Sequence, residues 1–117
     1  MESYKKLIVW QKAHELNIKI FRVANQFPKT DEARIVKNQL LRSCSSTPAN
    51  IIEGSAGEKG DKTFRNHLLI AKRSAAETEY WLLVTKELKY LPKKTCDEFI
   101  SLNGECMALL TNFLKKF

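Results

Sequence analysis

The sequence is poor in the residues that interrupt regular secondary structure. Only four glycines and three prolines occur among its 117 residues. An all-β fold needs a turn every few residues, and most tight turns require Gly or Pro. This scarcity argues against a β-sandwich or β-barrel and favours long helices.

Cysteine is also scarce, and its number is odd. Cys44, Cys96 and Cys106 are the only three, and no two of them form a C-x-x-C pair. A secreted disulfide framework normally uses an even number of cysteines, so we expect a reducing, cytoplasmic location. We interpret Cys44 and Cys106, which fall on apolar helical faces, as small buried hydrophobic residues.

Long apolar runs are missing. No segment approaches the roughly 18 apolar residues of a membrane-spanning helix. The run from Leu7 to Trp10 is too short for the core of a signal peptide. With 44% apolar and 28% charged residues, the composition is that of a soluble globular protein. The length predicts one domain over residues 1–117, with no membrane association.

No catalytic or metal-binding constellation is recognisable. His14 and His67 are the only histidines, and neither has a Cys or carboxylate at metal-ligand spacing. Glu77 and Glu79 are two residues apart and therefore point to different faces of a helix. The Gly-rich segment 54–60 lacks the order of a phosphate-binding loop and follows a helix, where that motif requires a strand. We therefore predict no enzymatic activity, no metal and no cofactor.

Helical periodicity dominates what remains. Four segments carry apolar residues at three- and four-residue steps, which is the pattern of one buried stripe on a helix. They run from about Leu7 to Phe27, from Thr30 or Asp31 to Gly54, from Asp61 to about Leu91, and from Lys94 or Thr95 to the C-terminus. Helices of this length joined by short connections pack antiparallel to their neighbours. The sequence thus predicts an all-α, up-and-down four-helix bundle.

Proline in the second segment predicts an irregularity there. Pro48 lacks a backbone N–H and its ring clashes with the preceding turn, so we expect the helix to kink or restart at this residue. Hydroxyl residues surround it and can bond to the backbone groups that the proline leaves free. These are Ser43, Ser45, Ser46 and Thr47.

Polar residues accompany this proline amid apolar neighbours. They are Gln39, Arg42, Asn50 and Glu53. Polar groups in an apolar surround need hydrogen-bond partners, so one interpretation is a network inside the bundle or across a subunit contact. The other interpretation is a set of ordinary exposed residues at a helix end. The sequence leaves both open.

Positive charge exceeds negative charge, with 20 Lys and Arg against 13 Asp and Glu, a net charge of +7. Cations seven residues apart on a helix are about 10 Å apart and can follow a phosphate backbone. The alternative is a merely solvated helix face. The candidate nucleic-acid-binding residues are Lys5, Lys12, Lys19 and Arg22 in the first segment and Arg65, Lys72 and Arg73 in the third.

Several blocks of sequence carry a family resemblance. They are Leu7–Ala13 with Trp10 and Gln11, Phe27-Pro28, Gln39–Ser43 with Arg42, and Pro48–Gly54 with Asn50 and Glu53. Further matches continue to Lys89-Tyr90-Leu91. Over Tyr4 to Leu91 the chain resembles the 23S rRNA-intervening-sequence protein family. It departs from the family pattern at Ile52, where Ala is usual, and at Arg73, where Gly is usual.

The resemblance implies a left-handed antiparallel bundle that assembles as a ring-like homopentamer and has no catalytic residues. Related proteins include the accessory protein of diversity-generating retroelements, a basic pentamer that partners a reverse transcriptase and nucleic acid. We therefore predict a non-enzymatic oligomer that binds RNA or another nucleic acid through its basic helix faces. The alternative is a scaffold or accessory protein that binds a protein partner such as a reverse transcriptase.

Overall fold

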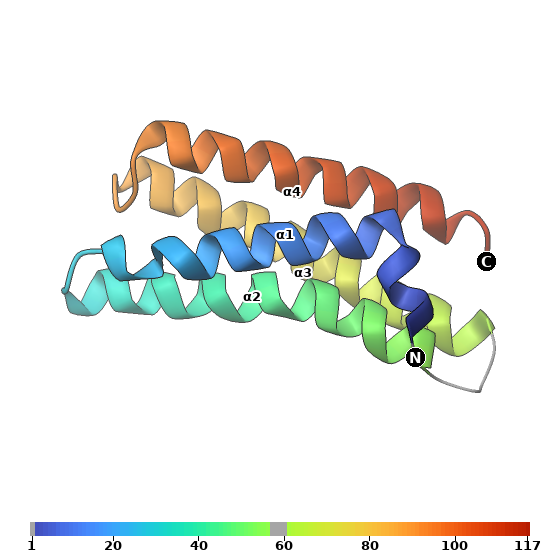
Figure 1. Cartoon of the computed structure of the whole chain (residues 1–117). Helices are drawn as coiled ribbons and strands as arrows, with labels where there is room; N and C mark the ends of the chain where they lie inside the picture. The colour runs from blue at the N-terminus through green and yellow to red at the C-terminus, as the bar shows by residue number, and fades with distance from the viewer. Residues whose placement is uncertain (1, 57–60) are drawn as a thin grey trace.

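The computed structural model describes residues 2–56 and 61–117, and these are helical apart from short connections. Four long helices, α1 to α4, form an elongated bundle with Cα extents of 45 × 21 × 20 Å (Figure 1). Their bounds are α1 Ile8–Val23, α2 Asp31–Ala56, α3 Asp61–Glu87 and α4 Lys93–Leu114. Two short 3₁₀ helices, η1 Glu2–Lys6 and η2 Ala24–Gln26, flank α1. The predicted all-α four-helix class is confirmed.

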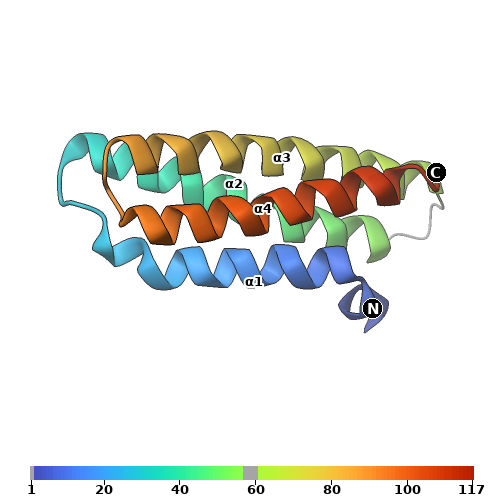
Figure 2. The same cartoon turned by 90° about the horizontal axis from the view of Figure 1, so that it is seen from above.

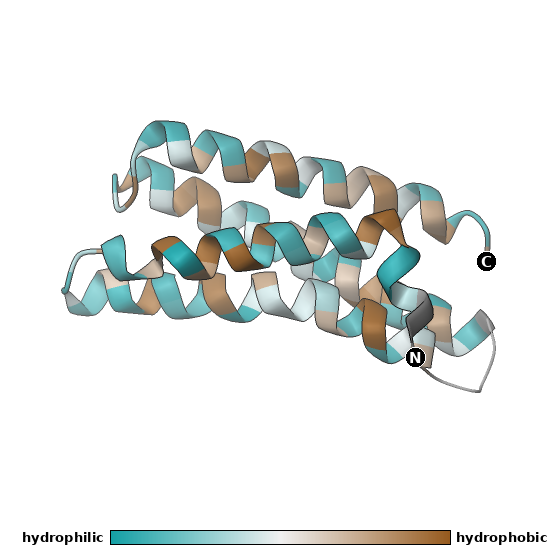
Figure 3. Ribbon diagram, viewed as in Figure 1, coloured by the Kyte–Doolittle hydropathy of each residue, from teal (hydrophilic) through white to brown (hydrophobic). Residues whose placement is uncertain are grey.

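Each helix packs against two others. α1 contacts α2 and α4, and α3 contacts the same two helices from the opposite side. Figure 2 shows α4 between α1 and α3, with α2 behind it. Both termini lie at one end of the bundle, together with the end of α2 and the start of α3 (Figure 1). Hydrophobic and hydrophilic bands alternate along the helices (Figure 3), as expected where one stripe of each is buried.

The helix ends follow from local chemistry. Phe27 takes an extended backbone (φ −61°, ψ 144°) before Pro28, which ends the first helical segment as predicted. The Thr30 hydroxyl accepts a hydrogen bond from the backbone N–H of Ala33 at 3.2 Å and so caps the start of α2.

The end of α3 differs from the prediction. The helix stops at Glu87 rather than near Leu91, because Lys89 adopts a left-handed backbone with φ 59°. The N–H of Tyr90 then bonds to the carbonyl of Thr85 at 3.0 Å, a helix-ending arrangement usually built on Gly. A lysine at this position gave no sequence signal of a stop.

α2 runs through Pro48 without a break, and Pro48 itself is buried. A restart of the helix at this residue was therefore a wrong expectation. A bend at Pro48 and the hand of the bundle stay predictions.

The interior consists of two apolar clusters separated by polar residues. One cluster includes Ile20, Leu40, Leu82 and Phe99, and the other includes Val9, Ile51, Leu68 and Leu110. Between them along α2, α3 and α4 lie buried polar side chains. These are Ser43, Thr47, Thr78 and Asn103.

The three cysteines are free and buried, as predicted for Cys44 and Cys106. Cys44 contributes to one apolar cluster and Cys106 to the other. Within residues 2–56 and 61–117, no helix combines the length and the hydropathy needed to cross a membrane.

Candidate functional site

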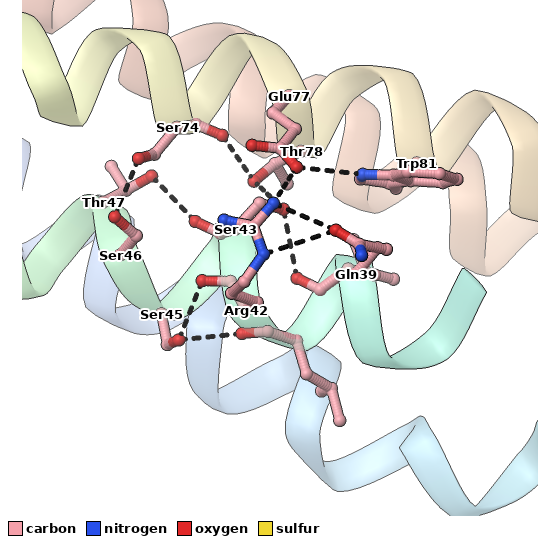
Figure 4. A network of polar contacts seen from close by, with 12 residues as sticks. Gln39, Arg42, Ser43, Ser45, Ser46, Thr47, Ser74, Glu77, Thr78 and Trp81 are labelled. Carbon is pink, nitrogen blue, oxygen red and sulfur yellow. Dashed lines mark hydrogen bonds and ion pairs between the residues drawn. The ribbon is translucent and has the colours of Figure 1, made fainter. Parts of the chain in front are cut away.

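Small hydroxyl side chains face each other where α2 meets α3 (Figure 4). The hydroxyl oxygens of Ser43 and Thr78 lie 2.9 Å apart, and both residues are fully buried. About one helical turn further along the seam, Ser74 donates to the Ser46 hydroxyl at 2.8 Å. Side chains of this size let two helices approach closely while their polar atoms satisfy one another.

Gly54 extends the close approach toward the α2–α3 connection. A Cβ atom at this position would lie 2.7 Å from Cδ1 of Phe64 and 2.8 Å from Cβ of His67. Both distances are shorter than real carbon contacts, so any side chain larger than hydrogen would force α2 away from α3. Gly54 is therefore a packing residue inside α2 and not part of a turn.

A charged cluster covers the outer edge of the same seam (Figure 4). The guanidinium of Arg42 pairs with the carboxylate of Glu77 and also donates to Oε1 of Gln39, at 3.0 Å from Nη2. Nε1 of Trp81 donates to the same Glu77 carboxylate at 3.3 Å. Glu77 is thus held from both helices, and the Arg42 side chain keeps 58% of its surface exposed.

Asn50 continues the contacts toward Gly54. Its Nδ2 donates to the carbonyl of Ser46 at 2.9 Å, and its Oδ1 lies 3.2 Å from Nδ1 of His67. Nδ1 of His67 is also 3.8 Å from a carboxylate oxygen of Glu53. The four polar residues singled out in the sequence therefore contact partners within one chain, in two groups on either side of the Ser46–Ser74 contact.

The hydroxyl groups near Pro48 have partners other than those expected. Ser43, Ser45 and Thr47 bond to carbonyls of the preceding turn, those of Leu40, Leu41 and Ser43. Such bonds are ordinary for Ser and Thr in helices. Of these three hydroxyls, that of Ser43 also contacts α3, through Thr78.

Trp10 and Gln11 lie away from this seam. Trp10 stacks on His14 with ring centres 4.8 Å apart and meets the edge of Tyr4 at 5.0 Å. Gln11 donates from Nε2 to the carbonyl of Lys5 at 2.8 Å. These contacts hold η1 against α1. The indole N–H of Trp10 is buried and has no hydrogen-bond partner in the described part of the chain.

The row of cations expected on the first helix is interrupted. Lys5 lies in η1, before α1 begins, so it does not continue the helical spacing of Lys12 and Lys19. Both of these lysines face acidic side chains of α4, with Lys12 3.8 Å from Glu105 and Lys19 2.9 Å from Glu98.

Lys19 also pairs with Glu15 at 3.2 Å. The hydrogen bonds to Glu98 and then Glu15 raise the pKa of Lys19 above its ordinary value. Glu98 and Glu105 have the same seven-residue spacing as the lysines that they meet, a pattern that the sequence analysis of the first segment did not use.

The other candidate cations are not paired with acids. Across residues 2–56 and 61–117, Arg22, Arg65, Lys72 and Arg73 take part in no ion pair. Arg65 and Lys72 are seven residues apart on α3 and share one face of it, with Arg73 a little more than a quarter turn away. Among the described residues, Lys12 and Lys19 of α1 are thus paired, whereas Arg22 at the end of α1 and the three candidate cations of α3 are not.

The outer surface of α3 and the turn that follows it carry exposed apolar side chains. Ile70, Tyr80, Leu83 and Leu88 are each between 41% and 56% exposed, and Ile35 on the neighbouring α2 is 61% exposed. Their exposure could not be foreseen without knowing which side of each helix its neighbours cover.

Comparisons with known proteins follow these observations. A family model described as 23S rRNA-intervening sequence protein matches residues 5–112. A crystal structure of a protein of unknown function from the S23 ribosomal protein family of Bacteroides thetaiotaomicron is similar, with 28% sequence identity and a TM-score of 0.83. The match covers 92% of this chain and 99% of that one. A search of curated proteins gave no match.

Proposed function

Because the chain belongs to the 23S rRNA-intervening sequence protein family, we propose that it is a non-enzymatic, oligomeric bundle that binds RNA or another nucleic acid through basic side chains. The observation that carries this proposal is the set of unpaired cations Arg65, Lys72 and Arg73 on α3 in a chain of net charge +7. Cations without an acidic neighbour are available to phosphates, whose neutralisation releases counterions. Arg22 is available in the same way.

The non-enzymatic part of the proposal rests on the seam between α2 and α3. Its hydroxyl, amide and charged groups are bonded to one another, and Ser43 and Thr78 are fully buried. Catalytic groups need to reach a substrate, whereas these are occupied within the chain. Their arrangement fits a role in holding two helices together.

The exposed apolar side chains of α3 support the oligomeric part. Ile70, Tyr80 and Leu83 lie on α3 and Leu88 directly follows it, and covering these side chains removes apolar surface from water. The ring-like homopentamer implied by the family resemblance would cover them and repeat the α3 cations around the ring. Several weak phosphate contacts on one assembly bind a polyanion more tightly than a single copy does.

The test compares two sets of charge-neutralising substitutions. Arg65→Gln, Lys72→Gln and Arg73→Gln together remove the unpaired α3 cations, while Lys29→Gln, Lys37→Gln and Lys94→Gln remove the same charge elsewhere. Binding is measured by fluorescence anisotropy with mixed-sequence RNA and DNA across a salt series. The first set should make the negative slope of the log association constant against log salt concentration less steep by about three units. The second set should leave the slope nearly unchanged.

Two results would contradict nucleic-acid binding by α3: no binding at low salt, or equal losses from the two sets. Charge reversal at Lys12 or Lys19 is a poorer test, because it would set an acid against Glu105 or Glu98 and disturb the packing of α1 on α4. Light scattering tests the oligomer. Tyr80→Glu with Leu83→Glu should lower the particle mass, and a monomeric wild-type protein would contradict self-association.

The second candidate is a scaffold or accessory protein that binds a protein partner such as a reverse transcriptase. The exposed Tyr80, Leu83 and Leu88 favour it, because an apolar surface that self-association does not cover can dock another protein. The salt dependence of the binding affinity distinguishes the two candidate functions. Affinity for nucleic acid falls steeply with ionic strength, whereas apolar docking changes little.

A further inference from the structure

Two ion pairs join α1 to α4 in a regular order. Lys19 pairs with Glu98 at 2.9 Å, and Lys12 pairs with Glu105 at 3.8 Å. Because the two helices are antiparallel, seven residues backward on α1 correspond to seven residues forward on α4. Each step of this kind brings a lysine of α1 opposite an acid of α4.

The next step along α4 breaks the order. Seven residues beyond Glu105 stands Asn112, near the end of the bundle that holds both termini (Figure 1). A groove of about 260 Å³ opens here between residues 6–9 on one side and Leu109, Asn112, Phe113 and Lys116 on the other. None of its lining residues is acidic. Among the described residues that line the groove, the two charged ones, Lys6 and Lys116, are both cations.

The groove combines an apolar floor with charged edges. Val9 is buried, and Leu7, Leu109 and Phe113 are half-buried, so carbon surface lines its depth. Figure 3 shows the hydrophobic first turn of α1 at this end of the molecule. Lys6 and Lys116 are exposed at the rim, and Nζ of Lys116 lies 5.6 Å from the centre of the Phe113 ring. Ile8, also at the rim, is 59% exposed.

We propose that this groove binds an acidic segment of a partner protein, with one large apolar side chain in the groove and a carboxylate on each side of it. The flanking carboxylates would pair with Lys6 and Lys116 and so supply the acid that α4 lacks at Asn112. At 260 Å³ the groove is smaller than typical small-molecule pockets of roughly 300–1,000 Å³, which suits a single side chain.

The apolar floor distinguishes this site from a phosphate-binding surface. A nucleic-acid backbone gains nothing from Leu7, Leu109 or Phe113, whereas an apolar anchor between two acids uses both the floor and the rim. Lys5 has contacts of its own and is not counted among the groove's cations. The inference does not depend on nucleic-acid binding, because the cations invoked for that function lie on α3.

The probe is a fluorescein-labelled peptide, Glu-Asp-Phe-Leu-Asp-Glu, measured by fluorescence anisotropy with the full chain. The decisive variant is Asn112→Glu, which continues the acidic repeat of α4 and places a carboxylate in the lining that contains Lys6 and Lys116. It should weaken peptide binding about tenfold or more, because like charges then oppose each other. Asn112→Gln should bind as the wild type does. Asn38→Glu, the same charge change on an exposed residue of α2, should also leave binding unchanged.

The apolar anchor is tested separately. Ile8→Ser removes an exposed rim contact, and a peptide with Ser in place of Phe and Leu removes the anchor itself; each should weaken binding. Equal affinity of wild type and Asn112→Glu, or no binding of the peptide by the wild type, would overturn the proposal. So would an oligonucleotide that competes with the peptide and loses affinity equally in Asn112→Glu. Oligonucleotide binding that survives Asn112→Glu separates this site from the α3 cations.

Discussion

The hydroxyl oxygens of Ser43 on α2 and Thr78 on α3 lie 2.9 Å apart, with neither residue exposed to solvent. Each hydroxyl also has a carbonyl within reach, Leu40 at 3.2 Å from Ser43 and Ser74 at 2.9 Å from Thr78. Whichever of the two donates across the helices, no buried hydroxyl is left without a partner. A satisfied polar pair of this kind costs little to bury and more to break on one side only.

Removing one hydroxyl of this pair should therefore lower the free energy of unfolding, because the remaining buried hydroxyl loses a hydrogen-bond partner. Thr78→Val keeps the shape and deletes the hydroxyl, and we expect a loss of about 1–2 kcal/mol in the free energy of unfolding. Ser43→Ala should cost a similar amount, and the double variant should cost less than the sum. Urea denaturation of the four proteins measures the coupling energy. Simple additivity would show that the two hydroxyls do not depend on each other.

Glycine positions in two helices offer a matched comparison. Gly54→Ala should lower the free energy of unfolding by about 1–3 kcal/mol, because the new methyl group would press on Phe64 and His67. A Cβ at Gly104 meets nothing within 4 Å, so Gly104→Ala should raise stability by about 0.5–1 kcal/mol through helix propensity alone. Thermal or urea unfolding of each variant measures the change in the free energy of unfolding. Equal effects at the two sites would mean that α2 and α3 are not closely packed at Gly54.

Asn103 ties α4 to the backbone of α3. Its Nδ2 donates to the carbonyl of Ala75 at 2.9 Å, and the side chain is 2% exposed. Asn103→Asp replaces this donor by a carboxylate whose pKa burial would raise. The protonated acid can still donate, so this variant should be close to wild type at acidic pH. It should lose stability as pH rises through the pKa of the buried carboxyl.

Urea titrations at several pH values should show this dependence in Asn103→Asp beyond that of the wild type. Asn103→Leu is the control, because it lacks the donor at every pH. A parallel pH profile for the three proteins would contradict an interior hydrogen bond at this position.

The buried thiols predict a loss of stability in alkali. Burial raises the pKa of Cys44 and of Cys106 from 9.0 to about 12. In the unfolded chain the thiols ionise from about pH 9, while the folded state keeps their protons, so folding stability falls as pH rises from about 9 to 12. Cys44→Ala with Cys106→Ala should reduce this slope in urea titrations. At neutral pH, thiol reagents should label the native protein far more slowly than the denatured one, and fast native labelling would contradict the burial.

Much of the fold is predictable from local patterns, whereas the site depends on contacts between distant segments. Leu16 and Ile20 mark the buried stripe of α1, and Pro28 marks the end of its segment. The end of α3 escaped prediction because Lys89 occupies a backbone region where Gly is the usual signal. The pairing of Lys12 with Glu105 requires knowing that α1 and α4 are neighbours.

The exposure of Tyr80 could not be predicted from the sequence for the same reason: it depends on which helices are neighbours. A helix sequence shows that apolar residues occur on several of its faces, but the neighbours decide which faces are covered. Small residues in the middle of α3, among them Ser74 and Ala75, are a local signal of close packing, and the Ser74 hydroxyl does contact Ser46 of α2.

The polar residues at mid-length divide the interior into two compartments, and this has a consequence for how the chain can change. Leu110 shares a cluster with Val9 and Ile51, while Phe99 belongs to the other. A volume change at Leu110 is then absorbed by its own compartment, and effects in the two halves should add independently. Substitutions in one apolar cluster should then need no compensating change in the other, provided that the buried polar residues between them are kept.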